Sequence, residues 1–97
     1  MTTDNGGSLE ARRRKLLFRC RHRGSKELDL VFGAFASAHL YALGEGALDE
    51  LDRLLNAPDD DLYAWLRGHC PVPDIYASPV FEMLKAVCDR KNPTWNV

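Results

Sequence analysis

The sequence predicts an all-α domain, a compact irregular bundle of about five short helices. Apolar residues recur at three- and four-residue intervals in successive stretches of the chain, which is the spacing of one helix face. Glycine or proline separates these stretches, and no segment shows the alternation of β-branched residues that is typical of a strand. The 97 residues are 45% hydrophobic and 28% charged, as in an ordinary globular domain.

The N-terminal region predicts a leader followed by a basic first helix. Residues 1–8 are polar and rich in glycine, so we expect a disordered leader. Ser8 suits the N-cap of the first helix. Gly24 suits the left-handed conformation that ends a helix, and Ser25 can cap the next one, so the two helices should meet at a sharp corner. The apolar side of this first helix carries Leu9, Leu16, Leu17 and Cys20.

Two further helices are expected between this corner and Pro58. The second should span about residues 26–41 and the third residues 47–56, with the glycines of residues 43–46 between them. Proline disfavours helical geometry in the residue before it, so the third helix ends ahead of Pro58. The expected buried residues are Leu28, Val31, Phe32, Phe35 and Ala38 in the second helix and Leu48, Leu51, Leu54 and Leu55 in the third.

The acidic run 59–61 should provide the N-cap and first-turn negative charge of a short fourth helix. After a loop with two prolines, Ser78 can cap a fifth helix that has Pro79 at its first position. The expected apolar residues are Leu62, Tyr63, Trp65 and Leu66 in the fourth helix and Phe81, Leu84, Val87 and Cys88 in the fifth. One helical domain, residues 9–92, should then be followed by a flexible tail, residues 93–97.

The charges are unevenly distributed along the chain, although the net charge is only −1. Residues 12–26 contain no acid, and residues 45–61 have only one basic residue, Arg53. We therefore expect a basic and an acidic region on the folded domain, which suits oriented docking on a protein. The basic residues of the first segment are Arg12, Arg13, Arg14, Lys15, Arg19, Arg21, Arg23 and Lys26.

The cysteines and the N-terminus indicate the compartment. Cys20, Cys70 and Cys88 are odd in number and lack CxxC spacing, which predicts free thiols in a reducing compartment; their roles are left open. No apolar run approaches the ~18 residues of a membrane span, and the first residues lack the apolar core of a signal peptide. The bacterial cytoplasm is therefore the expected location.

The segment 23–27 is the best candidate for a binding site. It places a guanidinium, a bare turn backbone and a carboxylate in one tight corner, where Arg23, Gly24 and Glu27 can grip a partner through charge-assisted hydrogen bonds. The neighbouring basic residues Arg21, His22 and Lys26 extend the expected partner-binding site. A purely structural alternative is that Gly24 ends one helix while Glu27 offsets the dipole of the next.

Two segments resemble a known family, the small assembly factors that promote covalent attachment of FAD to the flavoprotein subunit of succinate dehydrogenase, and of fumarate reductase in some bacteria. The first segment is RRRKLLFRCRHRGSKELDLVFGAFA, whose R-G-x-x-E signature falls on Arg23, Gly24 and Glu27. The second is LLNAPDDDLYAWL, residues 54–66. Both segments, at this spacing in a short helical chain, form a specific signal.

The resemblance implies an irregular helical bundle without enzymatic activity, which docks on the unflavinylated subunit through the R-G-x-x-E corner. In the family that the chain resembles, the flavin becomes bonded to a histidine of the partner, with the chemistry performed largely in the partner's own active site. The implied role is therefore chaperone-like, with no tightly bound cofactor and with FAD attached to the partner protein. Arg23, Gly24 and Glu27 carry over as contact residues, and we expect a monomer.

A rival interpretation rests on the basic helix, which suggests an antitoxin-like regulator or a binder of nucleic acid or an anionic membrane surface. No nucleic-acid recognition signature accompanies the charge, so nucleic acid is not the expected partner. The cysteines and histidines lack paired zinc-ligand spacings, so we expect no metal site and no catalytic residues. Trp65 could stack a flavin, but its helix also carries Leu62 and Leu66, which favours a core position.

Overall fold

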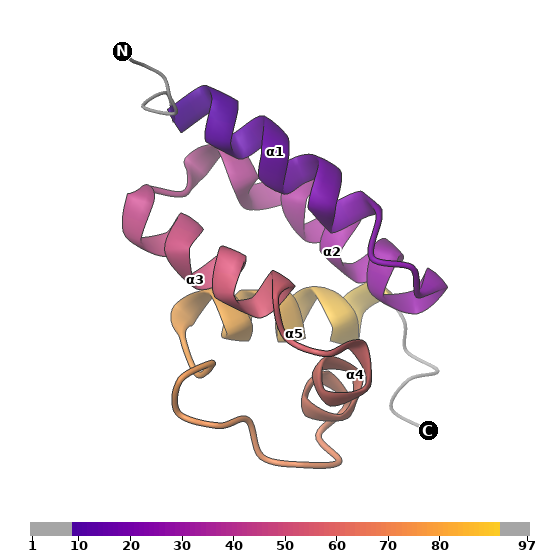
Figure 1. The fold of residues 1–97 in the computed structure, drawn as a ribbon. Coiled ribbons are helices and arrows are strands. Elements are labelled where there is room, and N and C mark those ends of the chain that lie inside the picture. Colours follow the sequence, from indigo (N-terminus) through magenta and orange to yellow (C-terminus); the bar gives the residue numbers. More distant parts are fainter. Residues whose placement is uncertain (1–8, 92–97) are drawn as a thin grey trace.

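The computed structural model of the chain describes residues 9–91, and within these residues it contains helices and no strand (Figure 1). This confirms the all-α prediction of about five helices. The expected leader and tail lie outside the described residues, so the limits of the domain stay predictions. The helices are α1 (Leu9–Arg21), α2 (Lys26–His39), the short 3₁₀ helix η1 (Leu40–Ala42), α3 (Glu45–Leu55), α4 (Asp59–Arg67) and α5 (Pro79–Lys91).

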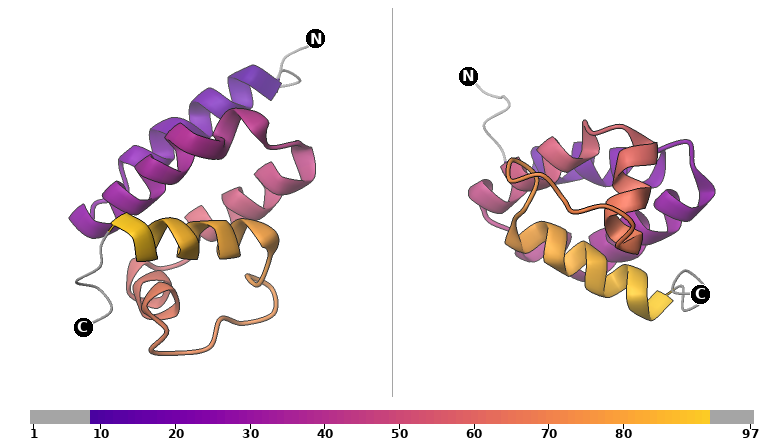
Figure 2. Two further views of the ribbon diagram at one scale, coloured as in Figure 1. Left: turned by 180° about the vertical axis from the view of Figure 1, so that it is seen from behind. Right: turned by 90° about the horizontal axis from the view of Figure 1, so that it is seen from below.

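The helices form two layers. In one layer α1 and α2 run side by side as an antiparallel hairpin, and in the other α3 and α5 pack beneath them (Figures 1 and 2). The short helix α4 lies at one end of the second layer, packed on α5, and is seen end-on in Figure 1. The turn between α1 and α2 therefore stands at the same end of the molecule as the turn between α3 and α4.

The core lies between the two layers and is built from the predicted apolar stripes. Phe32 and Phe35 of α2 are fully buried, and so are most leucines of α3. All four expected residues of α5 are buried, and Trp65 is a core residue that packs 4.9 Å from the ring of Tyr76. The prediction for Ala38 is wrong: it is exposed, and the buried stripe of α2 runs through Ala36 and on into Leu40.

Three helix boundaries differ from the expected ones, and the smallest difference is the end of the third helix at Leu55, one residue early. The second helix ends at His39, and the chain tightens into η1, where the Leu43 amide donates to the Leu40 carbonyl at 3.2 Å. The third helix begins two residues before the expected start, at Glu45, because the Leu48 amide closes the first turn on the Gly44 carbonyl at 2.9 Å. Gly46 is thus tolerated inside the helix.

The predicted caps at Ser25 and Ser78 are confirmed, the one at Ser8 lies outside the described residues, and the expected aspartate cap of α4 is wrong. The Ser25 hydroxyl accepts from the Leu28 amide at 3.5 Å, and the Ser78 hydroxyl accepts from the Phe81 amide at 3.1 Å. The N-cap position of α4 is occupied by Pro58, so the three aspartates fill the first helical turn. They still place negative charge at the positive end of the helix dipole.

The three cysteines are free thiols, as expected. Cys70 is exposed in the loop before α5, whereas Cys20 and Cys88 are buried. Burial raises the pKa of the Cys20 thiol to about 12 and that of the Cys88 thiol to about 11. Among residues 9–91, no helix is long and apolar enough to cross a membrane.

Candidate functional site

The corner between α1 and α2 is bare at its tip. Gly24 has a φ of 97°, in the left-handed region that favours glycine. A Cβ placed on Gly24 would meet no other atom within 4 Å, so the surrounding space is open. The Asp29 amide donates to the Ser25 carbonyl at 2.8 Å and starts α2 directly after the turn. A partner can therefore approach the backbone of this corner closely.

The side chain of Arg23 points into the molecule, away from the exposed tip of the corner. It is only 9% exposed and reaches across to the turn between α3 and α4. One terminal nitrogen donates to the Leu55 carbonyl, and the other donates to the Ala57 carbonyl at 3.0 Å and to a carboxylate oxygen of Asp59. The guanidinium thus joins the end of α3 to the first turn of α4.

The backbone of Arg23 is held as firmly as its side chain. Its amide donates to Oδ1 of Asp29 at 2.6 Å, and its guanidinium carbon lies 5.5 Å from the centre of the Phe32 ring, within the range of a cation–π contact. We call Arg23, Asp29, Asp59 and the carbonyls of Leu55 and Ala57 the arginine brace. Neither aspartate was predicted as a partner of Arg23. Asp59 lies 36 positions away, and no local spacing reveals such a contact, whereas Asp29 lies only 6 positions away, across the turn.

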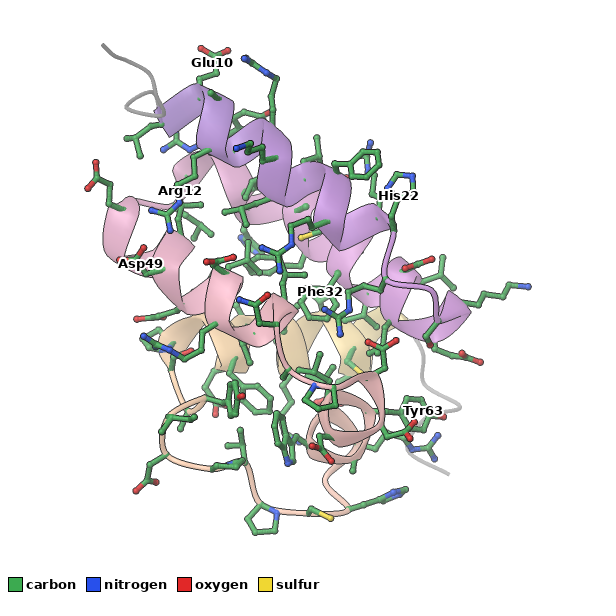
Figure 3. The ribbon with its side chains drawn as sticks, in the orientation of Figure 1. Glu10, Arg12, His22, Phe32, Asp49 and Tyr63 are labelled. Atoms are coloured by element: carbon green, nitrogen blue, oxygen red, sulfur yellow. The ribbon has the colours of Figure 1, made fainter. Side chains whose placement is uncertain are left out.

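Three basic residues of the first segment pair with acids of the second, so the predicted basic and acidic regions lose part of their charge to each other. Arg12 contacts Asp49 at 2.5 Å across the α1–α3 interface, in the space between the two helices in Figure 3. Arg19 forms an ion pair with Asp52 and also donates to Oδ1 of Asn56 at 2.7 Å. At 100° per residue, positions 12 and 19 of α1 fall along one stripe, and that stripe faces α3. Arg23 follows the end of α1 and reaches α4.

These pairs weaken the rival interpretation of α1 as a binder of polyanions. Arg13 is also engaged, since it donates to the Leu43 carbonyl at 2.7 Å. Arg14 and Lys15 are exposed on the outer side of α1. The charge density of the sequence therefore overstates the positive potential of the surface.

Five of the six predicted site residues are exposed in or next to the turn between α1 and α2, and three of them, Arg21, Gly24 and Lys26, line one groove. Arg21, His22, Gly24, Lys26 and Glu27 are all exposed, and we call these five the corner surface. Glu27 accepts from the Ser25 hydroxyl at 3.5 Å, and Arg21 lies 3.5 Å from the Ser37 hydroxyl. The corner surface carries both charge signs around a bare glycine, which suits directional hydrogen bonding to another protein.

A shallow groove of about 710 Å³ continues the corner surface along α2. Its lining includes Arg21, Gly24 and Lys26, and the side chain of Leu30 stands in it with 56% of its surface exposed. The sequence analysis missed Leu30. The helical spacing could have revealed it, because Leu30 lies off the buried stripe formed by Leu28, Phe32 and their neighbours.

An aromatic pair on α1 was also missed. Phe18 is 62% exposed and stacks on His22, with ring centroids 4.0 Å apart and an interplanar angle of 15°. Nδ1 of His22 lies 2.7 Å from the Phe18 carbonyl oxygen, which fixes the imidazole on the helix. Figure 3 shows His22 on the side of α1 that faces away from α3. An exposed aromatic pair beside the corner adds apolar contact area to this face.

The chemistry of this site is that of binding. Within residues 9–91, no group of three or more histidine, cysteine or acidic side chains gathers as it would around a metal ion. The site residues, with the exception of Arg23, are exposed, and the groove beside them is open rather than an enclosed cavity. Small-molecule sites usually enclose most of the ligand, so this surface suits a macromolecule better.

Comparison with known proteins matches this chain to one family. Residues 14–88 match the family model described as flavinator of succinate dehydrogenase. The chain is 36% identical over 77 residues to the FAD assembly factor SdhE of Acetobacter pasteurianus, which covers 79% of the chain and 71% of that relative. It is also similar to the mitochondrial succinate dehydrogenase assembly factor 2 of two eukaryotes.

The match to the Danio rerio protein has 37% identity and covers 82% of the chain and 52% of that relative. The match to the Scheffersomyces stipitis protein has 38% identity and covers 90% of the chain and 60% of that relative. The chain thus spans about half to three-fifths of these mitochondrial relatives. The family match includes the arginine brace and the corner surface.

Proposed function

The chain belongs to the flavinator of succinate dehydrogenase family, and from this premise we propose that it is an assembly factor for a covalent flavoprotein. It binds the flavoprotein subunit of succinate dehydrogenase before FAD is attached and promotes the attachment. The observation that carries the proposal is the exposed corner surface inside the matched residues. This surface offers Glu27, Lys26 and the Gly24 backbone together.

The assembly factor acts on the partner without catalytic residues of its own. Covalent flavinylation needs a histidine of the partner and the flavin held in reacting geometry, and such positioning lowers the barrier of a bond-forming step. A factor that binds one conformation of the partner more tightly than another shifts the partner toward it. FAD is then the cofactor of the partner, and this chain holds no cofactor tightly.

Each residue group has its own part in docking. Glu27 and Lys26 form charge-assisted hydrogen bonds with the partner, Gly24 lets the partner backbone come close, and Arg21 and His22 widen the contact. Arg23 belongs to the site through its backbone and its brace, which present Gly24 in the left-handed conformation. The exposed Phe18 adds an apolar contact beside His22.

Partner range, oligomeric state and location complete the proposal. The proposed partners include the flavoprotein subunit of fumarate reductase in some bacteria. The factor acts as a monomer, since one corner surface per chain is enough for a one-to-one complex with the subunit. The free thiols support a reducing compartment, and we assign the factor to the bacterial cytoplasm.

The test is flavinylation of the apo flavoprotein subunit from the same organism. The subunit is incubated with FAD and with the wild-type chain, Glu27→Ala or Glu45→Ala, and covalent FAD is measured by in-gel fluorescence after denaturation. Glu45 is the matched control, because it is also an exposed acid in the first turn of a helix. The wild type and Glu45→Ala should accelerate incorporation, and Glu27→Ala should lose most of that effect.

The opposite result is equally clear. If the wild-type chain neither binds the apo subunit nor changes the rate of covalent incorporation, the proposed function is wrong. If Glu27→Ala and Glu45→Ala both match the wild type, the assembly role stands but the docking surface lies elsewhere on the molecule.

A further inference from the structure

We propose that Asp59 is a positioning residue for docking, which acts through Arg23 and sets the orientation of the corner surface from the first turn of α4. This inference rests on the proposed function and deepens it. Asp59 lies 36 positions from Arg23 in the sequence, yet its carboxylate contacts the Arg23 guanidinium. It belongs to the second of the two helical layers and the corner belongs to the first.

The geometry of the brace leaves Arg23 little freedom. Its terminal nitrogens meet three oxygens from the α3–α4 turn, those of Leu55, Ala57 and Asp59, while its amide meets Asp29 at 2.6 Å. A guanidinium is planar and presents its donors in a fixed fork, so contacts on several sides fix its orientation as well as its position. Arg23 directly precedes Gly24, and its orientation is therefore passed to the tip of the corner.

Asp59 is the hydrogen-bond partner of the Arg23 guanidinium that a side-chain substitution can remove. The carbonyls of Leu55 and Ala57 belong to the backbone, and Asp29 holds only the amide. Arg23 also keeps a buried Nε that has no acceptor, so the negative charge of Asp59 is the main compensation for a nearly buried cation. Without this charge, hydration favours a guanidinium that turns toward water. The corner then loses its contact with the first turn of α4.

The adjacent aspartate provides a matched control. Asp60 lies in the same first turn of α4 and is exposed, so its replacement by Asn removes the same charge from the same helix end. Asp59→Asn and Asp60→Asn therefore change the helix dipole interaction alike. Only Asp59→Asn removes the carboxylate that contacts Arg23.

The experiment has two readouts, both at a temperature where circular dichroism shows each variant fully folded. The first is the concentration of the factor that gives half of the maximal flavinylation rate. Asp59→Asn should raise this concentration at least fivefold with an unchanged maximal rate, because a corner that is less often in the docking orientation binds more weakly and acts normally once bound. Asp60→Asn should stay within twofold of the wild type.

The second readout is the hydrogen exchange rate of the Arg23 amide, measured by NMR. This amide is protected by Asp29 only while the corner keeps its geometry. Its exchange should accelerate at least tenfold in Asp59→Asn and not in Asp60→Asn, while amides in the middle of α5 stay unchanged in both variants. A role in global stability alone would not move this one amide in the folded protein.

Each outcome decides the matter. If both readouts are the same for Asp59→Asn and Asp60→Asn, the inference is overturned. If the wild type has no effect on flavinylation, the proposed function fails, and the Arg23 amide still shows whether Asp59 holds the corner. If Asp59→Asn does not fold, Asp59→Glu displaces the carboxylate by one methylene and is compared with Asp60→Glu in the same two assays.

Discussion

The two sides of the segment from Arg12 to Glu27 differ in the folded protein, because one side is paired with other helices and the other is exposed to solvent. On the inner side, Arg12, Arg19 and Arg23 form ion pairs with aspartates of α3 and α4. On the outer side, the corner surface and the stacked Phe18 remain exposed to solvent. One segment thus attaches the first layer to the second and presents a face to a partner.

The contrast teaches that the density of charge in a sequence does not measure the charge of a surface. Eight basic residues between positions 12 and 26 suggest a polyanion site when they are read as a list. The helical period divides them, and those that face α3 and α4 are compensated there. The remaining outer residues include both charge signs, which favours a specific protein partner over a uniform polyanion.

The inner side is the more sensitive to truncation. Arg23→Ala removes a nearly buried guanidinium and leaves Asp59 and two backbone carbonyls without this donor, so it should lower the free energy of unfolding by about 3 kcal/mol. Urea unfolding followed by circular dichroism measures the change. Arg14→Ala, on the exposed outer side, should change it by less than about 0.5 kcal/mol. Equal losses from the two substitutions would contradict the division into an inner and an outer side.

The tip of the corner should separate stability from docking. Gly24→Ala and Gly24→Arg both place a side chain at a positive φ, so each should lower the free energy of unfolding by about 1–2 kcal/mol. Only Gly24→Arg fills the open space in front of the corner with bulk and charge, so it should abolish binding to the apo subunit while Gly24→Ala retains part of it. Urea unfolding and binding titrations give the two quantities.

Gly46 is the control for this pair, because it lies in the helix α3 without a positive φ. Gly46→Ala should raise the free energy of unfolding by about 0.5–1 kcal/mol. A loss of stability from Gly46→Ala, or normal binding by a folded Gly24→Arg, would show that the account of the corner is wrong.

The peripheral ion pair of the inner side should contribute little. Arg12 and Asp49 have side chains that are 32% and 60% exposed, so a double-mutant cycle with alanine at both positions should give a coupling energy of about 0.2–1 kcal/mol. The coupling should shrink in 1 M salt, where the Debye length falls to about 3 Å. A coupling energy as large as the stability loss from Arg23→Ala would contradict this account. It would mean that the Arg12–Asp49 pair, and not Arg23, is the main attachment between the two layers.

The cysteines should show the same difference between buried and exposed residues in their reactivity toward thiol reagents. At pH 8 a thiol reagent should modify the exposed Cys70 at once and Cys20 and Cys88 only after unfolding, because burial raises the pKa of Cys20 to about 12 and that of Cys88 to about 11. Mass spectrometry of the labelled chain checks the order. Rapid labelling of Cys20 in the folded chain would contradict its place in the core.

The same pKa shifts set the direction of an alkaline effect. Below about pH 9 these thiols are protonated in both the folded and the unfolded chain, so they add no pH dependence. Above about pH 9 the unfolded chain releases these protons first, so the free energy of unfolding should fall as the pH rises. Cys20→Ser should reduce this slope in urea titrations between pH 8 and 10.

Much of the fold follows from the sequence because local signals determine it. Leucine spacing identified α3 and its buried face, and the caps at Ser25 and Ser78 marked two helix starts correctly. The start of α3 at Glu45 was missed because tertiary packing overrides the low helix propensity of Gly46.

The candidate site was predicted only in part, for a related reason. A glycine between a basic and an acidic residue indicates an exposed turn, and the corner surface is exposed as expected. The inward direction of Arg23 could not be predicted, because it depends on Asp59 and on carbonyls that only the packing of α3 and α4 brings near. Contacts between residues so far apart in the chain do not appear in the spacing pattern of the sequence.

The central claim is that the outer side docks while the inner side supports it, and the most direct measurement is the affinity of the apo flavoprotein subunit for folded variants. Calorimetric titrations would compare the wild type, Glu27→Ala and Glu45→Ala. Both glutamates are exposed acids in the first turn of a helix, so the two substitutions should change stability by similar small amounts. The account predicts at least a tenfold weaker binding, about 1.4 kcal/mol, for Glu27→Ala and wild-type affinity for Glu45→Ala. Unchanged affinity for Glu27→Ala, or equal losses for both variants, would contradict it.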